Sequence, residues 1–131
     1  VNLGGDELND PDNPEGLWKE VKTALGNKPP GTWSFGHTHN AAVYTNTSAI
    51  GEARCNGRLA GHGAIPYGES VTLQNSLDSG LIDYFPKTHL GPDEIRVRNG
   101  FATIEIDANG SMTERFYEIA DGVTEAQQVW P

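Results

Sequence analysis

The sequence of 131 residues has little cysteine, little basic charge and no long apolar run. Its one cysteine, Cys55, excludes an internal disulfide bond. Nine basic residues against eighteen acidic ones give a formal charge of −9, which does not suit binding to nucleic acid or to an anionic membrane. No segment approaches the ~18–20 apolar residues of a bilayer span, and no signal peptide is visible. We expect a soluble protein without a nucleic-acid or membrane partner, whose compartment the sequence does not give.

The length predicts one domain or part of one, with a polar tail over residues 1–12 and a body over residues 13–131. We interpret the acidic side chains of the tail as solvated, with carboxylate metal ligands as the alternative reading. The chain has sixteen glycines and eight prolines, which are many for this length. They predict short elements joined by long ordered loops rather than a helix bundle.

One helix is predicted, from Pro14 to Leu25. Asn13 can cap it, Pro14 suits its first turn and Gly26 ends it. Its apolar face has a helical period. The following Pro-Pro-Gly turn leads into a strand over Thr32–Phe35. The residues of the apolar face are Leu17, Val21, Ala24 and Leu25.

The rest of the chain favours β-strands. We predict a strand over Ala41–Thr45, with Ala49–Cys55 as its partner, and loops over Gly57–Gly68 and Pro86–Glu94. Further strands are expected over residues 94–98, 101–107 and 112–119, with an Asn-Gly hairpin turn between the last two. The sequence therefore predicts an α+β fold of mostly antiparallel strands with one N-terminal helix.

The densest chemistry lies in the segment Gly36-His37-Thr38-His39-Asn40, directly after the predicted strand Thr32–Phe35. Histidines at positions i and i+2 of an extended chain project to the same side. Two imidazoles on one side of a strand-end loop suit a metal ion or an anion. We therefore predict His37 and His39 as metal ligands and Asn40 as a neighbouring residue that contacts either the phosphate or the ligands themselves. The alternative is a pair of surface loop histidines.

Other candidates are weaker. His62 stands between two glycines, which we expect to expose its ring near the metal site, in a catalytic or substrate-binding role. A loop histidine bonded to the backbone is the alternative. His89 reads as a plain loop residue, and Cys55 reads as a small buried hydrophobe. The aromatic residues expected in the core are Trp18, Trp33, Phe101 and Phe116.

The run Phe-Gly-His-Thr-His-Asn-Ala-Ala-Val-Tyr resembles the GHxH motif of the calcineurin-like metallophosphoesterases. In that family the motif ends a core strand, and each histidine contacts one of two metal ions. The resemblance implies that His37 and His39 are metal ligands and that the fold is like the C-terminal half of the family's β-sandwich. The run Gly61–Gly68 resembles a glycine-rich loop that follows GHxH in some members. The hairpin Gly100–Gly122 resembles their closing strands.

The other ligand motifs of that family (DxH, GDxxD, and GNH followed by Asp or Glu) do not occur in this sequence. The resemblance thus implies the C-terminal portion of a hydrolase of phosphate mono- or diesters, with manganese, iron or zinc as cofactor. We expect such a chain to be incomplete alone. The alternative is a non-catalytic binding or assembly module of the same fold. For the hydrolase the expected partner is a phosphate ester. For the assembly module it is a second copy of the chain or a separate N-terminal segment.

Overall fold

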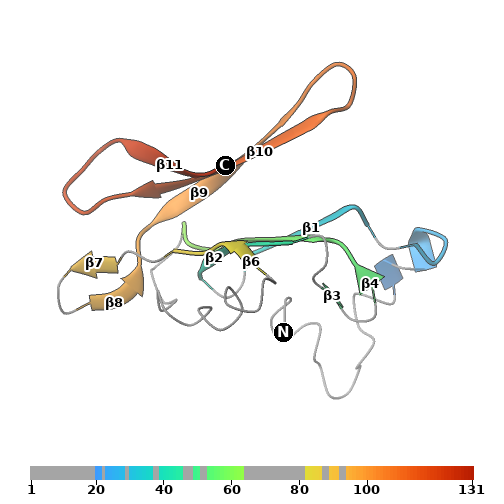
Figure 1. Cartoon of the computed structure of the whole chain (residues 1–131), viewed down its shortest axis with the longest axis horizontal. Helices are drawn as coiled ribbons and strands as arrows, with labels where there is room; N and C mark the ends of the chain where they lie inside the picture. The colour runs from blue at the N-terminus through green and yellow to red at the C-terminus, as the bar shows by residue number, and fades with distance from the viewer. Residues whose placement is uncertain are drawn as a thin grey trace.

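The computed structural model describes residues 20–21, 23–28, 30–36, 39–45, 49–50, 53–63, 82–86, 89–91 and 94–131. The strands in these ranges are β1 (Thr32–Phe35), β2 (Ala41–Tyr44), β3 (Ala49–Ile50), β4 (Ala53–Arg54), β5 (Asn56–Ala60), β6 (Ile82–Tyr84), β7 (His89–Gly91), β8 (Glu94–Val97), β9 (Gly100–Ile106), β10 (Met112–Ile119) and β11 (Ala126–Trp130). They form a four-stranded sheet, a three-stranded sheet and the two pairs β3–β4 and β7–β8. The three-stranded sheet lies across one face of the four-stranded sheet (Figure 1).

The four-stranded sheet has the order β1-β5-β2-β6. β1 and β5 are parallel, while β2 is antiparallel to both β5 and β6. All four residues of β2 are buried, because side chains from its two faces enter two different hydrophobic clusters. Ala42 and Tyr44 point into one cluster, and Ala41 and Val43 point into the other, beneath β10.

The three-stranded sheet is an antiparallel meander in the order β11-β10-β9. The turn between β9 and β10 is held by Asp107, whose carboxylate accepts the N–H groups of Asn109 and Ser111 at 2.8 Å each. Gly110 has φ +81° and its N–H donates to Asp107 C=O. The predicted Asn-Gly hairpin turn is confirmed. Only its glycine, Gly110, has a left-handed backbone, whereas Asn109 does not have a positive φ.

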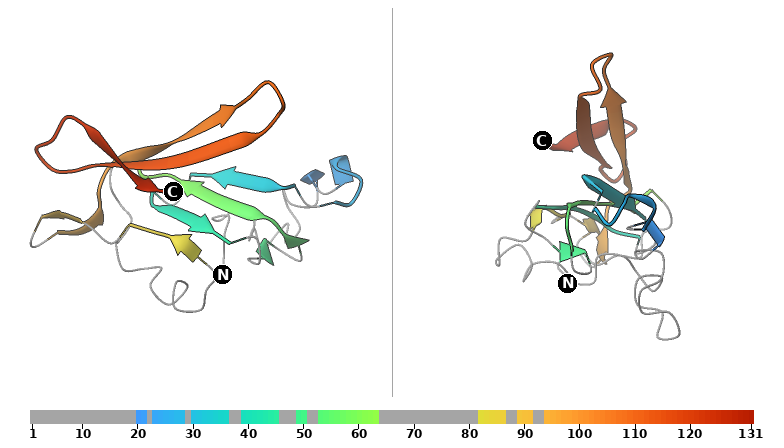
Figure 2. Two further views of the ribbon diagram at one scale, coloured as in Figure 1. Left: turned by 45° about the horizontal axis from the view of Figure 1, so that its top comes forward. Right: turned by 90° about the vertical axis from the view of Figure 1, so that its right-hand side faces the viewer.

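The two sheets meet through the inward face of β10 (Figure 2). Phe116 is 1% exposed and packs with Val43 of the sheet below. The ring of Trp130 meets the Phe116 ring edge-on at 5.9 Å, which fixes β11 to the same cluster. Burial of Phe116 alone contributes roughly 2–3 kcal/mol.

The predicted aromatic core is right only in part. Phe116 is buried as expected, and Trp33 is partly buried against the cluster on the opposite face of the four-stranded sheet. Phe101 is 43% exposed, so its expected place in the core is wrong. It lies on the outer face of β9, where its ring stacks on that of Tyr117 at 4.9 Å. Trp18 lies outside the described residues.

The predicted α+β class is wrong, because the described chain is mostly β and contains no helix element. Of the predicted helix Pro14–Leu25, the described residues show one helical turn, closed by Leu25 N–H to Val21 C=O at 3.0 Å. Leu25 is 45% exposed, so the expected apolar face has no covering surface there. Helices this short depend on packing for their stability. Gly26 ends the turn as predicted, with φ +65°.

Two predicted loops contain strands. Residues 56–60 form β5, the interior strand that pairs with β1 and β2, although Gly57–Gly68 was expected to be loop. Gly57 belongs in this strand because a Cβ there would lie 3.1 Å from the Tyr44 ring on the neighbouring strand. The expected pairing of β2 with residues 49–55 is also wrong, since β3 and β4 pair with each other. Within Pro86–Glu94, β7 pairs with β8.

Candidate functional site

The segment Gly36–Asn40 connects β1 to β2. Because β5 lies between these two strands, the connection passes the carboxyl end of β5. The two are joined there by a hydrogen bond of 2.8 Å from Gly61 N–H to Asn40 C=O. A Cβ on Gly61 would overlap Gly36 C=O and lie 2.9 Å from His39 N. The absence of a side chain at residue 61 therefore allows the backbone of Gly36 and His39 to lie directly against the end of β5.

His39 is half-buried and has φ 49°, in the left-handed region. Such a conformation is uncommon for a residue with a side chain, costs on the order of 1 kcal/mol, and is frequent at functional sites. The left-handed backbone therefore falls at the second histidine of the motif. His37 and Thr38 lie outside the described residues, so the predicted pairing of His37 with His39 stays a prediction.

Asn40 is 6% exposed. Its Oδ1 accepts the Ala41 N–H at 2.8 Å, while its backbone carbonyl accepts the Gly61 N–H. Asn40 therefore fixes the end of the segment where β2 begins. These two hydrogen bonds give Asn40 a role in anchoring the backbone next to His39. A contact between Asn40 and phosphate stays a prediction.

His62 differs most from its prediction. The expected exposed ring is 0% exposed, so the expectation that the flanking glycines open it to solvent is wrong. Its Nε2 lies 3.2 Å from Tyr117 C=O, and since a carbonyl only accepts, Nε2–H is the donor. The ring is stacked on Phe116 with centroids 6.3 Å apart. The catalytic role of His62 stays a prediction that its burial does not favour.

The neutral form of His62 is favoured by its surroundings. Burial lowers the pKa of its imidazole, while the Tyr117 hydrogen bond and the charge of Glu118 act in the opposite direction. Glu118 is itself 5% exposed, and its Oε1 accepts the Tyr84 hydroxyl at 2.5 Å. Burial and then Glu118 raise the pKa of Tyr84, so its hydroxyl stays protonated and donates.

Sequence reasoning missed Tyr84 and Glu118, but one signal was available. Glu118 and Phe116 are two residues apart on β10, so they project from the same face of the strand. An acidic side chain two places from a core aromatic residue indicates a buried polar contact. Its partner Tyr84 lies outside every helix, strand and loop that the sequence predicted.

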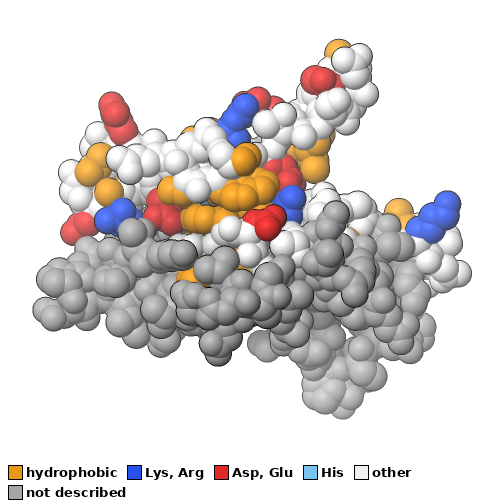
Figure 3. All heavy atoms as spheres, in the orientation of Figure 1, with side chains coloured by type: hydrophobic (Ala, Val, Ile, Leu, Met, Phe, Trp, Pro, Cys, Tyr) orange, Lys and Arg blue, Asp and Glu red, His pale blue; other side chains and the backbone are white. Residues whose placement is uncertain are grey.

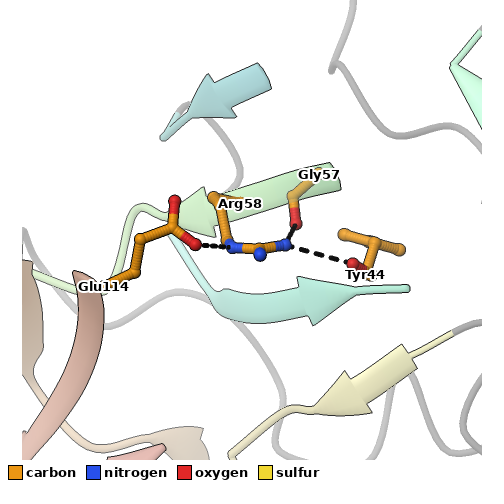
Figure 4. Close-up of polar contacts among 4 residues, drawn as sticks. All are labelled: Tyr44, Gly57, Arg58 and Glu114. Atoms are coloured by element: carbon orange, nitrogen blue, oxygen red, sulfur yellow. Dashed lines mark hydrogen bonds and ion pairs between the residues drawn. The ribbon is translucent and has the colours of Figure 1, made fainter. Parts of the chain in front are cut away.

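A second polar contact joins the sheets through Arg58 of β5 and Glu114 of β10 (Figure 4). Arg58 Nε donates to Glu114 Oε2 at 2.6 Å, and the two side chains are only 12% and 8% exposed. One terminal nitrogen of Arg58 donates to the carbonyls of Tyr44 and Gly57 at 3.1 and 3.0 Å. The guanidinium also lies 5.2 Å from the centre of the Trp130 ring. This contact was missed because Arg58 falls in the predicted loop.

The described residues do not form a complete metal site by themselves. Among them, no group of three or more His, Cys, Asp or Glu side chains is placed to hold an ion. A catalytic zinc commonly takes three protein ligands. A metal site that included His39 would therefore need further ligands from outside the described ranges or from another chain. None of the described residues forms a helix with the length and hydropathy of a membrane span.

Comparisons with models of protein families, with curated proteins and with solved structures gave no significant match for this chain. The fold and the site therefore stand on their own geometry.

Proposed function

We propose that this chain contributes the C-terminal metal-ligating segment of a metallophosphoesterase-like hydrolase. The completed site hydrolyses phosphate mono- or diesters. One observation carries the proposal: His39 and Asn40 lie between the carboxyl end of β1 and the start of β2, and Asn40 is anchored to Ala41 and Gly61. A metal ligand needs this kind of support, because the protein must fix the ligand before the ion arrives.

In this proposal each residue has a limited role. His37 and His39 donate neutral imidazole nitrogens, which suit manganese, iron or zinc. Asn40 holds the backbone of the segment in register. The bound ions would activate water and neutralise phosphate charge, which a chain with a formal charge of −9 needs for an anionic substrate. The remaining ligands come from other residues or from another chain.

The second candidate function is a non-catalytic binding or assembly module. It is favoured by the burial of His62, the residue expected to approach the substrate, between Phe116 and the backbone of β10. In this account the Gly61-His62-Gly63 turn after β5 only packs the two sheets together, and His39 binds no ion.

Metal analysis separates the two candidates. The purified chain is incubated with manganese, ferrous iron or zinc, dialysed and measured by plasma mass spectrometry. The double variant His37→Ala/His39→Ala and the single-site control His89→Ala are treated in the same way. The proposal predicts about one equivalent or more of metal in the wild type and in His89→Ala, lost in the double variant. Equal metal in all three proteins, or none in any, contradicts a metal site that this chain forms through His37 and His39, and favours the binding module.

If the metal is bound at this site, hydrolysis of an aryl phosphate and of an aryl diester is the next assay. Turnover that requires His37 and His39 would establish the enzyme. Metal binding without turnover by this chain is the result expected of an incomplete site, and addition of the missing ligands in trans should then restore activity.

A further inference from the structure

The hairpin of β9 and β10 extends beyond the four-stranded sheet (Figures 1 and 2). Near the sheet its inward face is covered, as the burial of Phe116 shows. Towards the tip the same face carries Ile104, Ile106 and Met112, which are 51%, 70% and 45% exposed. Figure 3 shows hydrophobic side chains along this projecting hairpin. These three large apolar side chains form one solvent-exposed surface on one face of the hairpin.

β9 is also an edge strand of its sheet. Asp107 N–H bonds to Ser111 C=O, and Ile119 N–H bonds to Asn99 C=O, so the odd-numbered residues of this stretch bond to β10. In an antiparallel ladder bonded and non-bonded positions alternate. The N–H and C=O groups of Ala102, Ile104 and Ile106 are therefore directed away from β10. These polar groups are oriented so that another extended strand can pair with them.

We propose that the free edge of β9 pairs antiparallel with β9 of a second copy of this chain, with Ile104 on the twofold axis. Ile104 then lies opposite Ile104 of the second copy, and Ile106 lies opposite Ala102. The two apolar tips form one continuous face across both hairpins, and the large side chain of Ile106 meets the small one of Ala102. The partner is a copy of this chain because the edge is self-complementary in this register.

Charge and backbone bonding select this register. If the axis lay at Glu105, the two Glu105 carboxylates would face each other. If it lay at Ile106, Glu105 would face Asp107 of the second copy. Both registers place like charges opposite each other, which is unfavourable. A shift the other way, to Thr103, would pair Ile106 with Gly100, whose N–H is already bonded to His62 C=O at 3.0 Å. With Ile104 on the axis, Glu105 lies opposite Thr103, and Arg115 of its own chain still neutralises it at 2.9 Å.

The first test is the mass of the full chain by sedimentation velocity over about 1–100 µM, where an interface of modest size associates. The wild type should shift towards a dimer of the 14.1 kDa chain as concentration rises. Ile104→Lys should weaken dimerisation by roughly 30-fold or more, since one buried isoleucine is lost from each copy. Thr113→Lys is the matched control, because Thr113 is exposed on the outer face and its substitution changes the charge equally.

The second test fixes the register by cross-linking in a Cys55→Ser background, which removes the natural cysteine. Bonded antiparallel partners have Cα atoms about 5.5 Å apart, within disulfide range. Ile104→Cys should therefore form a dimer under mild oxidation, and Thr113→Cys should not. A wild type that stays monomeric over the whole range overturns the proposal. So does equal weakening by Ile104→Lys and Thr113→Lys, or equal cross-linking of both cysteines, because either result places the contact elsewhere.

Discussion

Two histidine-containing segments lie against each other at the end of β5, and they differ in almost every respect. His39 is half-buried, with a left-handed backbone, in the segment that resembles a metal-ligand motif. His62 is fully buried and bonded to the backbone of β10. Each follows close after a glycine. The comparison shows that a glycine near a histidine does not by itself expose the ring, because the missing side chain can equally let a neighbouring backbone close over it.

The largest predicted effect concerns the glycine that lets β9 pass over His62. A Cβ on Gly100 would overlap Tyr117 C=O and the His62 ring, and neither a backbone carbonyl nor a buried ring can move freely. We expect Gly100→Ala to lower the free energy of unfolding by about 3 kcal/mol or more. Urea denaturation measures the loss. Gly31→Ala is the control, because no atom lies within 4 Å of a Cβ at that position, and its effect should stay within about 0.5 kcal/mol.

The second prediction contrasts the two histidines directly. His62→Ala removes a buried ring and the hydrogen bond to Tyr117, and we expect a loss of about 2–4 kcal/mol. His39→Ala should cost less than about 1 kcal/mol, because the ring is only half-buried. Thermal and urea denaturation of both variants measure the difference. Equal losses would show that His39 is as much a packing residue as His62.

The third prediction concerns pH. Burial lowers the pKa of folded His62 below its ordinary value of 6.5, so the unfolded chain binds the proton more readily. The stability that depends on neutral His62 is therefore complete above about pH 6.5 and is lost as the pH falls from there towards the folded pKa. The free energy of unfolding at pH 7 and pH 5 should differ more in the wild type than in His62→Asn, which does not titrate. Equal pH dependence of the two proteins would contradict this account.

The smallest predicted effect is a gain. His39 has φ 49°, a conformation that glycine adopts without strain. We expect His39→Gly to raise the free energy of unfolding by up to about 1 kcal/mol while removing any metal-dependent stabilisation. Denaturation with and without zinc measures both terms. A loss of stability without metal would mean that contacts of the His39 side chain outweigh the strain of its backbone.

The sequence predicted the local parts of this fold best. β10 begins and ends where the alternation of Met112–Ile119 placed it, and the turn before it lies at the predicted Asn109-Gly110 pair. In both cases neighbouring residues determine the structure. β5 was missed because its glycine signals a loop locally, while its partners β1 and β2 are more than ten residues away along the chain. Pairing over that separation leaves no local pattern.

Alternation also predicts which side chains share a face without predicting what covers that face. Phe116 and Ile104 lie on the same face of the β9–β10 hairpin, yet one is 1% and the other 51% exposed. The difference arises because the four-stranded sheet underlies only one end of the hairpin. In the candidate site, the position of His39 after a strand was predictable, whereas the burial of His62 depends on a sheet that is formed about forty residues later in the chain.

The comparison of the two histidines is tested most directly by the ring signals of the four histidines in long-range ¹H–¹⁵N spectra during a zinc titration. We predict that two ring signals, assigned to His37 and His39, shift as the ion binds. The His62 signal should remain that of a neutral ring with the proton on Nε2. A zinc-dependent change at His62, or no change at His37 and His39, would contradict the account in which one histidine segment packs the fold and the other binds metal.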